Sequence, residues 1–151
     1  MKISDIVNGI AIKIDESFNN ATIYTEKVPQ GFLEPCFVIK LLNFEHIRMV
    51  GGRWLVQPLF NIMYFPSNTG GAIECSDVSL EIQRALKDIN LIGDIPMLAR
   101  SMRNEMVSGE DGDVVSHNMM RFDFFLLDKP DETFMSQLEQ YINKQRVNVI
   151  V

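Results

Sequence analysis

Cysteine and histidine are both scarce in this sequence, and their scarcity excludes several classes of chemistry. The 151 residues include two of each. Cys36 and Cys75 stand far apart and form no CxxC pair, so neither a disulfide framework nor a zinc site is supported. We interpret them as reduced, partly buried thiols. His46 and His117 fall on separate predicted strands, where a histidine usually occupies a polar face, so no catalytic site that uses both is expected.

Other signatures of catalysis and of ligand binding are missing as well. The pairs Gly51-Gly52 and Gly70-Gly71 lack the lysine and the strand-to-helix setting of a phosphate-binding loop, and no GxSxG nucleophile elbow occurs. The acidic turn over residues 110–113 lacks the ligand spacing of a calcium loop, so we interpret it as an exposed hairpin tip. The sequence therefore predicts a protein that is not an enzyme, with no catalytic residue, cofactor or metal.

The sequence also lacks a basic excess and a long apolar run. Lys and Arg number 14 against 20 Asp and Glu, a formal net charge of -6, which argues against a protein that grips nucleic-acid phosphates. The most continuous apolar run, from Cys36 to Phe44, is far shorter than the roughly 20 residues of a membrane-spanning helix. The start places Asp5 where a signal peptide needs unbroken apolar residues. We therefore expect a cytoplasmic protein without membrane contact.

The apolar content that is present indicates one folded domain. It amounts to 46% of the residues, which is typical of a globular chain and not of a disordered one. At this length a single domain buries roughly 69% of the surface that its extended chain exposes. No Pro/Gly-rich linker divides the sequence, so we predict a single domain over residues 1–151.

Apolar residues that recur every three or four positions predict amphipathic helices in three segments. The first segment covers residues 3–18, with Ser4 or Asp5 as the cap, and the second covers 72–89. The third is shorter, and its apolar stripe consists of Phe134, Leu138, Tyr141 and Ile142.

Alternation of apolar and polar residues predicts a first long hairpin. Its strands cover residues 36–49 and 54–65, and Gly51-Gly52 forms the turn. Pro58 implies a bulge or an edge, because proline has no N–H to donate to a ladder. A short strand at 22–25 precedes this hairpin.

A second long hairpin is predicted from strands over residues 97–107 and 114–127, which flank the acidic turn. Residues 147–151 are typical of a further strand or arm. The order of elements predicts an α+β fold, in which two to three amphipathic helices pack on a mostly antiparallel sheet of two long hairpins plus short strands.

Two regions are candidates for contacts with other chains. Arg53 and Trp54 follow the first hairpin turn, and these residue types are enriched at the energetic centres of interfaces, although a Trp that only caps the end of the sheet is an equal alternative. Methionines gather around the second hairpin, where we favour the core over a subunit interface, with Met102 and Met106 on the same side of their strand as Leu98. The candidate interface residues are Arg53, Trp54, Met106, Glu110, Asp111, Asp113 and Met119.

Several short segments resemble the tail terminator family of tailed bacteriophages and prophages, and together they span most of the chain. Their order and spacing agree with that family, as does an acidic turn followed by an aromatic-rich strand near residues 122–127. The motifs bear on the fold and not on catalysis. The segments are Met1–Ile10, Ile23–Glu26, Gln30–Phe32, Glu34–Phe37 and Tyr64–Pro66.

The resemblance implies a structural protein that assembles as a ring, typically a hexamer, on the end of the completed tail tube. Such a ring would stop tube polymerisation and contact the head-side connector, or head-completion protein. It would assemble in the host bacterial cytoplasm and remain at the head-proximal end of the virion tail. DNA would pass through the lumen without specific binding. The family offers no catalytic or cofactor-binding residues to carry over.

A small-molecule-binding or regulatory α+β domain that forms a small homo-oligomer is the alternative. This class would contain an apolar pocket with a few convergent polar groups within one chain. A ring-forming protein would instead bury a hairpin and the terminal helix or arm between neighbouring subunits.

Overall fold

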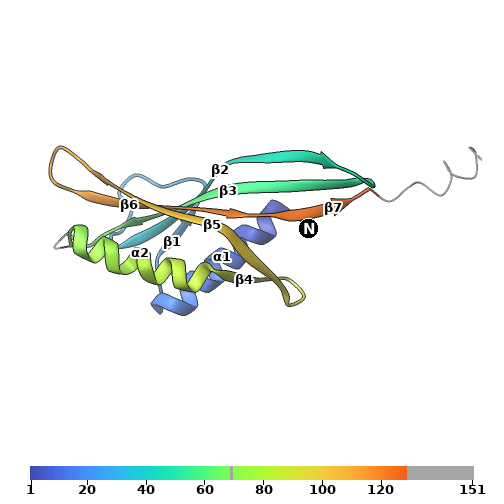
Figure 1. Ribbon diagram of the computed structural model, residues 1–151. Helices are drawn as coiled ribbons and strands as arrows, with labels where there is room; N and C mark the ends of the chain where they lie inside the picture. The colour runs from blue at the N-terminus through green and yellow to red at the C-terminus, as the bar shows by residue number, and fades with distance from the viewer. Residues whose placement is uncertain (69, 129–151) are drawn as a thin grey trace, which may run out of the picture.

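The computed structural model describes residues 1–68 and 70–128, which form two helices and seven strands around a curled, mostly antiparallel sheet (Figure 1). The α+β fold expected from the sequence is confirmed. The helices are α1 (Ile3–Phe18) and α2 (Ala72–Leu86). The strands are β1 (Ile23–Thr25), β2 (Cys36–Met49), β3 (Arg53–Phe65), β4 (Asp88–Leu91), β5 (Ile95–Ser108), β6 (Val114–Phe122) and β7 (Phe124–Leu127).

The sheet follows the order β1-β2-β3-β6-β5-β4, and β7 pairs with β3 beyond the end of β6. Among the described strands, β1 and β2 form the one parallel pair. Pro58 lies where the neighbour of β3 changes from β6, which ends its pairing at Leu59, to β7, which begins at Val56. The opposite strand bulges between Leu41 and Asn43. The proline therefore occupies a gap between two ladders, as its missing N–H requires.

Both helices lie on one face of the sheet, and the main core fills the space between them (Figure 1). The α1 stripe buries Ile6, Ile10 and Ile14 completely, because a spacing of four places these side chains on one side of the helix. A smaller cluster lies on the opposite face, which we call the open face, where Cys36, Val38 and Met63 pack beneath the loop that leads into β2.

Four details differ from the sequence predictions. The cap of α1 is Lys2, whose N–H donates to the Asp5 carboxylate at 2.8 Å. The second helix ends at Leu86, because Asp88–Leu91 pairs with β5 as β4. Ile89, which the sequence assigns to the apolar stripe of the helix, is buried in β4 instead.

The other two differences concern the second hairpin. The predicted strand over 114–127 breaks at Asp123 into β6 and β7. Leu98 does not share a side with Met102 and Met106, because the register shifts between Ala99 and Ser101; Leu98 is 71% exposed. The predicted third helix and the strand at 147–151 lie outside the described residues.

No helix in the described part of the chain is long and apolar enough to span a membrane.

Candidate interaction surface

Three strands project beyond the helices as a ribbon, which consists of residues 40–57 from β2 and β3 together with β7 (Figure 1). Every residue of β2 from Lys40 to Met49 is exposed. Gly51 and Gly52 form its tip with φ angles of 79° and 69°, which glycine adopts without steric cost. At the base of the ribbon, Val56 and Phe124 are buried in the main core; beyond them, the β2 strand of the ribbon has no helical cover.

Exposed apolar side chains are concentrated on this ribbon. Phe44 is 52% exposed, Phe125 60% and Leu127 70%. A monomeric protein rarely exposes so many large apolar side chains together, so the ribbon has the character of a contact surface. The exposed apolar residues of the ribbon are Leu41, Leu42, Phe44, Ile47, Met49, Val50, Phe125, Leu126 and Leu127.

These side chains align in rows across the ribbon. On the open face, Leu55 of β3 lies between Ile47 of β2 and Phe125 of β7. Directly opposed residues lie close enough for their side chains to touch. The row therefore forms one apolar strip that extends across three strands.

Trp54 contacts side chains from the neighbouring strands near the tip of the ribbon. Its indole N–H donates to the Asp128 carboxylate at 2.7 Å, its ring centroid lies 4.6 Å from that of His46, and the Arg48 guanidinium lies 5.9 Å from it. These partners belong to β2 and to the end of β7, so one side chain joins three strands.

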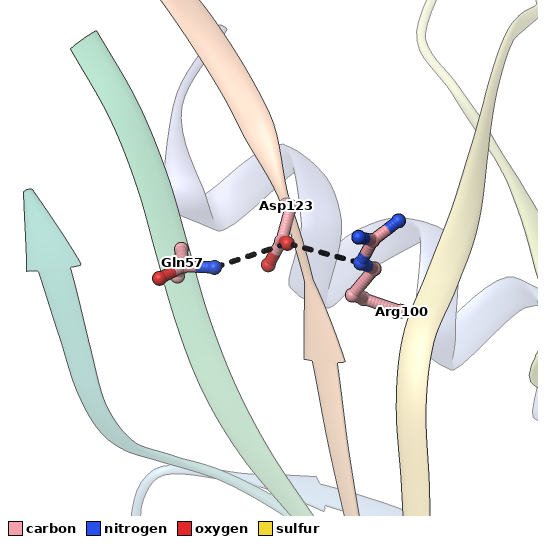
Figure 2. Close-up of polar contacts among 3 residues, drawn as sticks. All are labelled: Gln57, Arg100 and Asp123. Carbon is pink, nitrogen blue, oxygen red and sulfur yellow. Dashed lines mark hydrogen bonds and ion pairs between the residues drawn. The ribbon is translucent and has the colours of Figure 1, made fainter. Parts of the chain in front are cut away.

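The middle of the open face is polar. The Gln57 side-chain N–H donates to Asp123 at 3.1 Å, and the Arg100 Nε lies 3.8 Å from the same carboxylate (Figure 2). Asn61 and His117 share a hydrogen bond of 2.9 Å nearby. Three buried polar atoms of this region have no partner within the described residues: Asn61 Oδ1, Arg121 Nε and Asp123 Oδ1. Buried polar atoms are normally paired, so this face is suited to receiving polar groups from another molecule.

Beside the ribbon lies a groove that we call the fork. Strands β5 and β6 pair as far as Ala99 and Phe122 and then diverge, so that β7 stays on β3 while Ile95–Leu98 pairs with β4. The groove has a volume of about 730 Å³ and is mostly apolar. Its size falls in the range of ligand pockets, but its charged groups, Arg100 and Asp123, pair with each other and do not converge on the space.

The predicted interface residues fall in separate places. Arg53 is exposed and Trp54 half-buried at the ribbon tip, whereas the acidic turn lies at the opposite end of the sheet, beyond the Tyr64 end of β3 (Figure 1). Glu110, Asp111 and Asp113 are all exposed there, as expected of a hairpin tip. Met119 is half-buried on the open face, and Met106 packs against the main core.

Sequence reasoning missed the apolar rows of the ribbon. The pattern of β2 contains a signal, because Phe44, Ile47 and Met49 continue an apolar strand past the last residues that the helices cover. Periodicity alone does not distinguish a strand covered on both faces from one exposed on both.

The cysteines and the acidic residues form no metal site in the part of the chain that the structure describes. Cys36 and Cys75 are free, as predicted, and both are fully buried, whereas partial burial was expected. Burial raises the pKa of both thiols, with a smaller contribution from Glu34 at Cys36 and from Glu74 at Cys75. Both thiols are therefore protonated and unreactive near neutral pH.

The described residues thus form a helix-backed sheet with an exposed apolar ribbon. The model of the phage tail terminator protein family matches residues 5–134, and the chain belongs to that family. The family is one of structural phage tail proteins, which agrees with the resemblance seen in the sequence. No curated protein matches the chain.

One solved structure is similar to this chain with a TM-score of 0.46 and 8% identity, over 87% of this chain and 99% of its own.

Proposed function

We propose that the chain caps the tail tube, stops its polymerisation and contacts the head-side connector, as a ring of identical subunits, typically six. The observation that best supports a ring is the ribbon, which exposes apolar residues on both of its faces. A cyclic assembly buries different surfaces of one subunit against the next, which suits a projecting element with two apolar faces. The family membership supports the position at the tail.

The acidic balance of the chain supports passage of DNA through such a ring. Six copies at -6 each carry a formal charge of -36. Repulsion between this charge and DNA phosphates disfavours adhesion, so DNA would slide through the lumen without specific binding.

Electron microscopy of tails assembled without this protein tests the capping role. We expect overlong tubes, and addition of the purified protein during assembly should restore the normal length. Tubes of normal length in its absence would refute termination.

Substitution in the ribbon tests the ring. Ile47→Glu combined with Phe125→Glu places two charges in the apolar row, and we expect it to abolish oligomers in light scattering and to yield overlong tubes. Ile12→Glu combined with Leu80→Glu is the matched control, because these residues are 57% and 52% exposed on α1 and α2 and lie outside the ribbon. Rings of normal size from the ribbon variant would show that the ribbon is not the subunit interface.

A further inference from the structure

The fork exposes an unpaired strand edge. Among the described residues, β7 pairs with β3 alone, and its other edge faces the groove. The N–H of Asp128 donates to the Gly52 carbonyl at 2.8 Å, toward β3. Because backbone groups alternate sides along a strand, the N–H and C=O of Phe125 and of Leu127 point into the fork.

The opposite wall of the fork, formed by Ile95–Leu98 of β5, offers fewer backbone hydrogen-bonding groups. The N–H of Ala99 donates to the Lys87 carbonyl at 2.9 Å, away from the fork. By the same alternation, positions 96 and 98 point toward the fork, and Pro96 has no N–H to offer. Hydrogen bonding for an added strand is therefore complete only along β7.

The shape of the fork favours an extended chain as its occupant. One wall is formed by Phe124 and Phe125, the first two of the four residues of β7, and the side chains around it are mostly apolar. An added strand gains backbone hydrogen bonds from such an edge and side-chain contacts from the pockets beside it. Exposed edges of this kind are normally covered in native proteins.

We propose that Val147–Val151 of a neighbouring copy of this chain pairs with β7 in the fork as an added strand. This five-residue segment is rich in β-branched residues, and its alternation places three valines on one side and Asn148 and Ile150 on the other. The valines face the half of the fork formed by Met97 and Phe124, which are both buried. Asn148 and Ile150 then share the open face with Phe125. This inference rests on the proposed ring.

The length of chain beyond β7 favours a neighbouring copy over the same chain. A return to the same strand as a hairpin needs about 2–5 residues, whereas Lys129 to Arg146 intervene here. Those 18 residues span at most about 60 Å. This reach exceeds by far the roughly 13 Å length of a four-residue strand.

Hydrogen exchange of the full-length chain tests the pairing. We expect the amides of Phe125 and Leu127 to be protected in the assembled protein and to exchange at least tenfold faster in Val149→Asp, which places a charge against Met97 and Phe124. Asn148→Asp is the matched control, because it adds the same charge on the exposed side of the same segment, and it should retain protection. Equal exchange in all three proteins would overturn the proposal.

Disulfide trapping identifies the chain that supplies the strand. Phe125→Cys in one chain and Ile150→Cys in a second, size-tagged chain should form a mixed disulfide dimer after oxidation, since the native cysteines are buried. A chain that carries both substitutions tests the alternative. If its disulfide forms only within single chains, or if no disulfide forms in either experiment, the strand does not come from a neighbouring copy. The two proposals fail separately. Tubes of normal length without the protein would refute capping but not the strand pairing, and a β7 edge that stays unprotected in intact rings would refute only the strand pairing.

Discussion

At the scale of single residues, Gly9 shows how a helix is held against the sheet. A Cβ at this position would lie 3.2 Å from the Asn90 carbonyl oxygen and 3.3 Å from Ile89 Cδ1. Gly→Ala in a helix interior normally stabilises by about 0.5–1 kcal/mol. Here we expect Gly9→Ala to lower the free energy of unfolding by about 1 kcal/mol, because the β4 backbone resists displacement. Asn8→Ala, on the exposed side of the same turn, should raise it by about 0.5 kcal/mol; a stabilised Gly9→Ala in urea unfolding would contradict this close packing.

A second prediction at the residue scale concerns alkaline pH. The Tyr64 hydroxyl donates to Glu74 at 2.9 Å, and burial, followed by Glu74, raises the pKa of Tyr64 well above its usual range. A raised pKa in the folded state gives stability that is complete below the unfolded value of about 10 and is lost at higher pH. Tyr64→Phe should therefore cost about 1 kcal/mol at pH 7, and the difference from wild type should shrink above pH 10. Urea unfolding between pH 7 and 11 measures this difference, and a constant value would refute the assignment.

At the scale of elements, the sequence correctly predicts a helix or strand that buries one regular apolar stripe. It fails at the boundary between two elements when the apolar spacing continues from one into the next. The spacing of Ile6, Ile10 and Ile14 locates α1 correctly at both ends. Ile89 misleads, because it continues the helical spacing of α2 in the sequence but is buried in β4. The register shift at Arg100 and the break at Asp123 depend on the divergence of β5 from β7, which is a property of the whole sheet and not of either segment.

The ribbon provides a prediction for one such element. Trp54→Ala removes the side chain that joins β2, β3 and the end of β7. We expect hydrogen exchange to accelerate for residues 44–55 and 125–128 but not for α1, because α1 shares the main core with Val56 and Phe124 at the base of the ribbon. Trp54→Phe keeps a ring and loses only the bond to Asp128, so its effect should be smaller. Equal acceleration in α1 would show that the ribbon and the core unfold together.

At the scale of the whole molecule, the candidate site was only partly predictable. Arg53 and Trp54 mark the ribbon tip in the sequence because their residue types are typical of interfaces. The apolar pattern of β2 is visible in the sequence, but the fork and the alignment of the rows across strands are not, since they arise from pairing between distant strands, as in the row of Ile47, Leu55 and Phe125. A pattern along one strand does not reveal which neighbour leaves an edge unpaired.

Charge is a property of the whole assembly, and the acidic turn tests how its location matters. The triple variant Glu110→Lys, Asp111→Lys and Asp113→Lys takes the formal net charge of the chain from -6 to 0. Because the turn is exposed, we expect the unfolding free energy to change by less than about 0.5 kcal/mol. DNA should be retained by this variant at low salt and released as salt rises, because each lysine near a phosphate displaces counterions.

The control for this prediction moves the same charge change to the helices. Asp15, Glu16 and Glu81 are exposed on α1 and α2, and their replacement by lysine gives the same net charge at a different place. If the acidic turn faces the passage for DNA, the turn variant should retain DNA at salt concentrations at which the helix variant does not, measured by filter binding across a salt series. Equal retention by the two proteins would show that net charge alone governs adhesion, and an unfolded turn variant would show that the turn supports the fold.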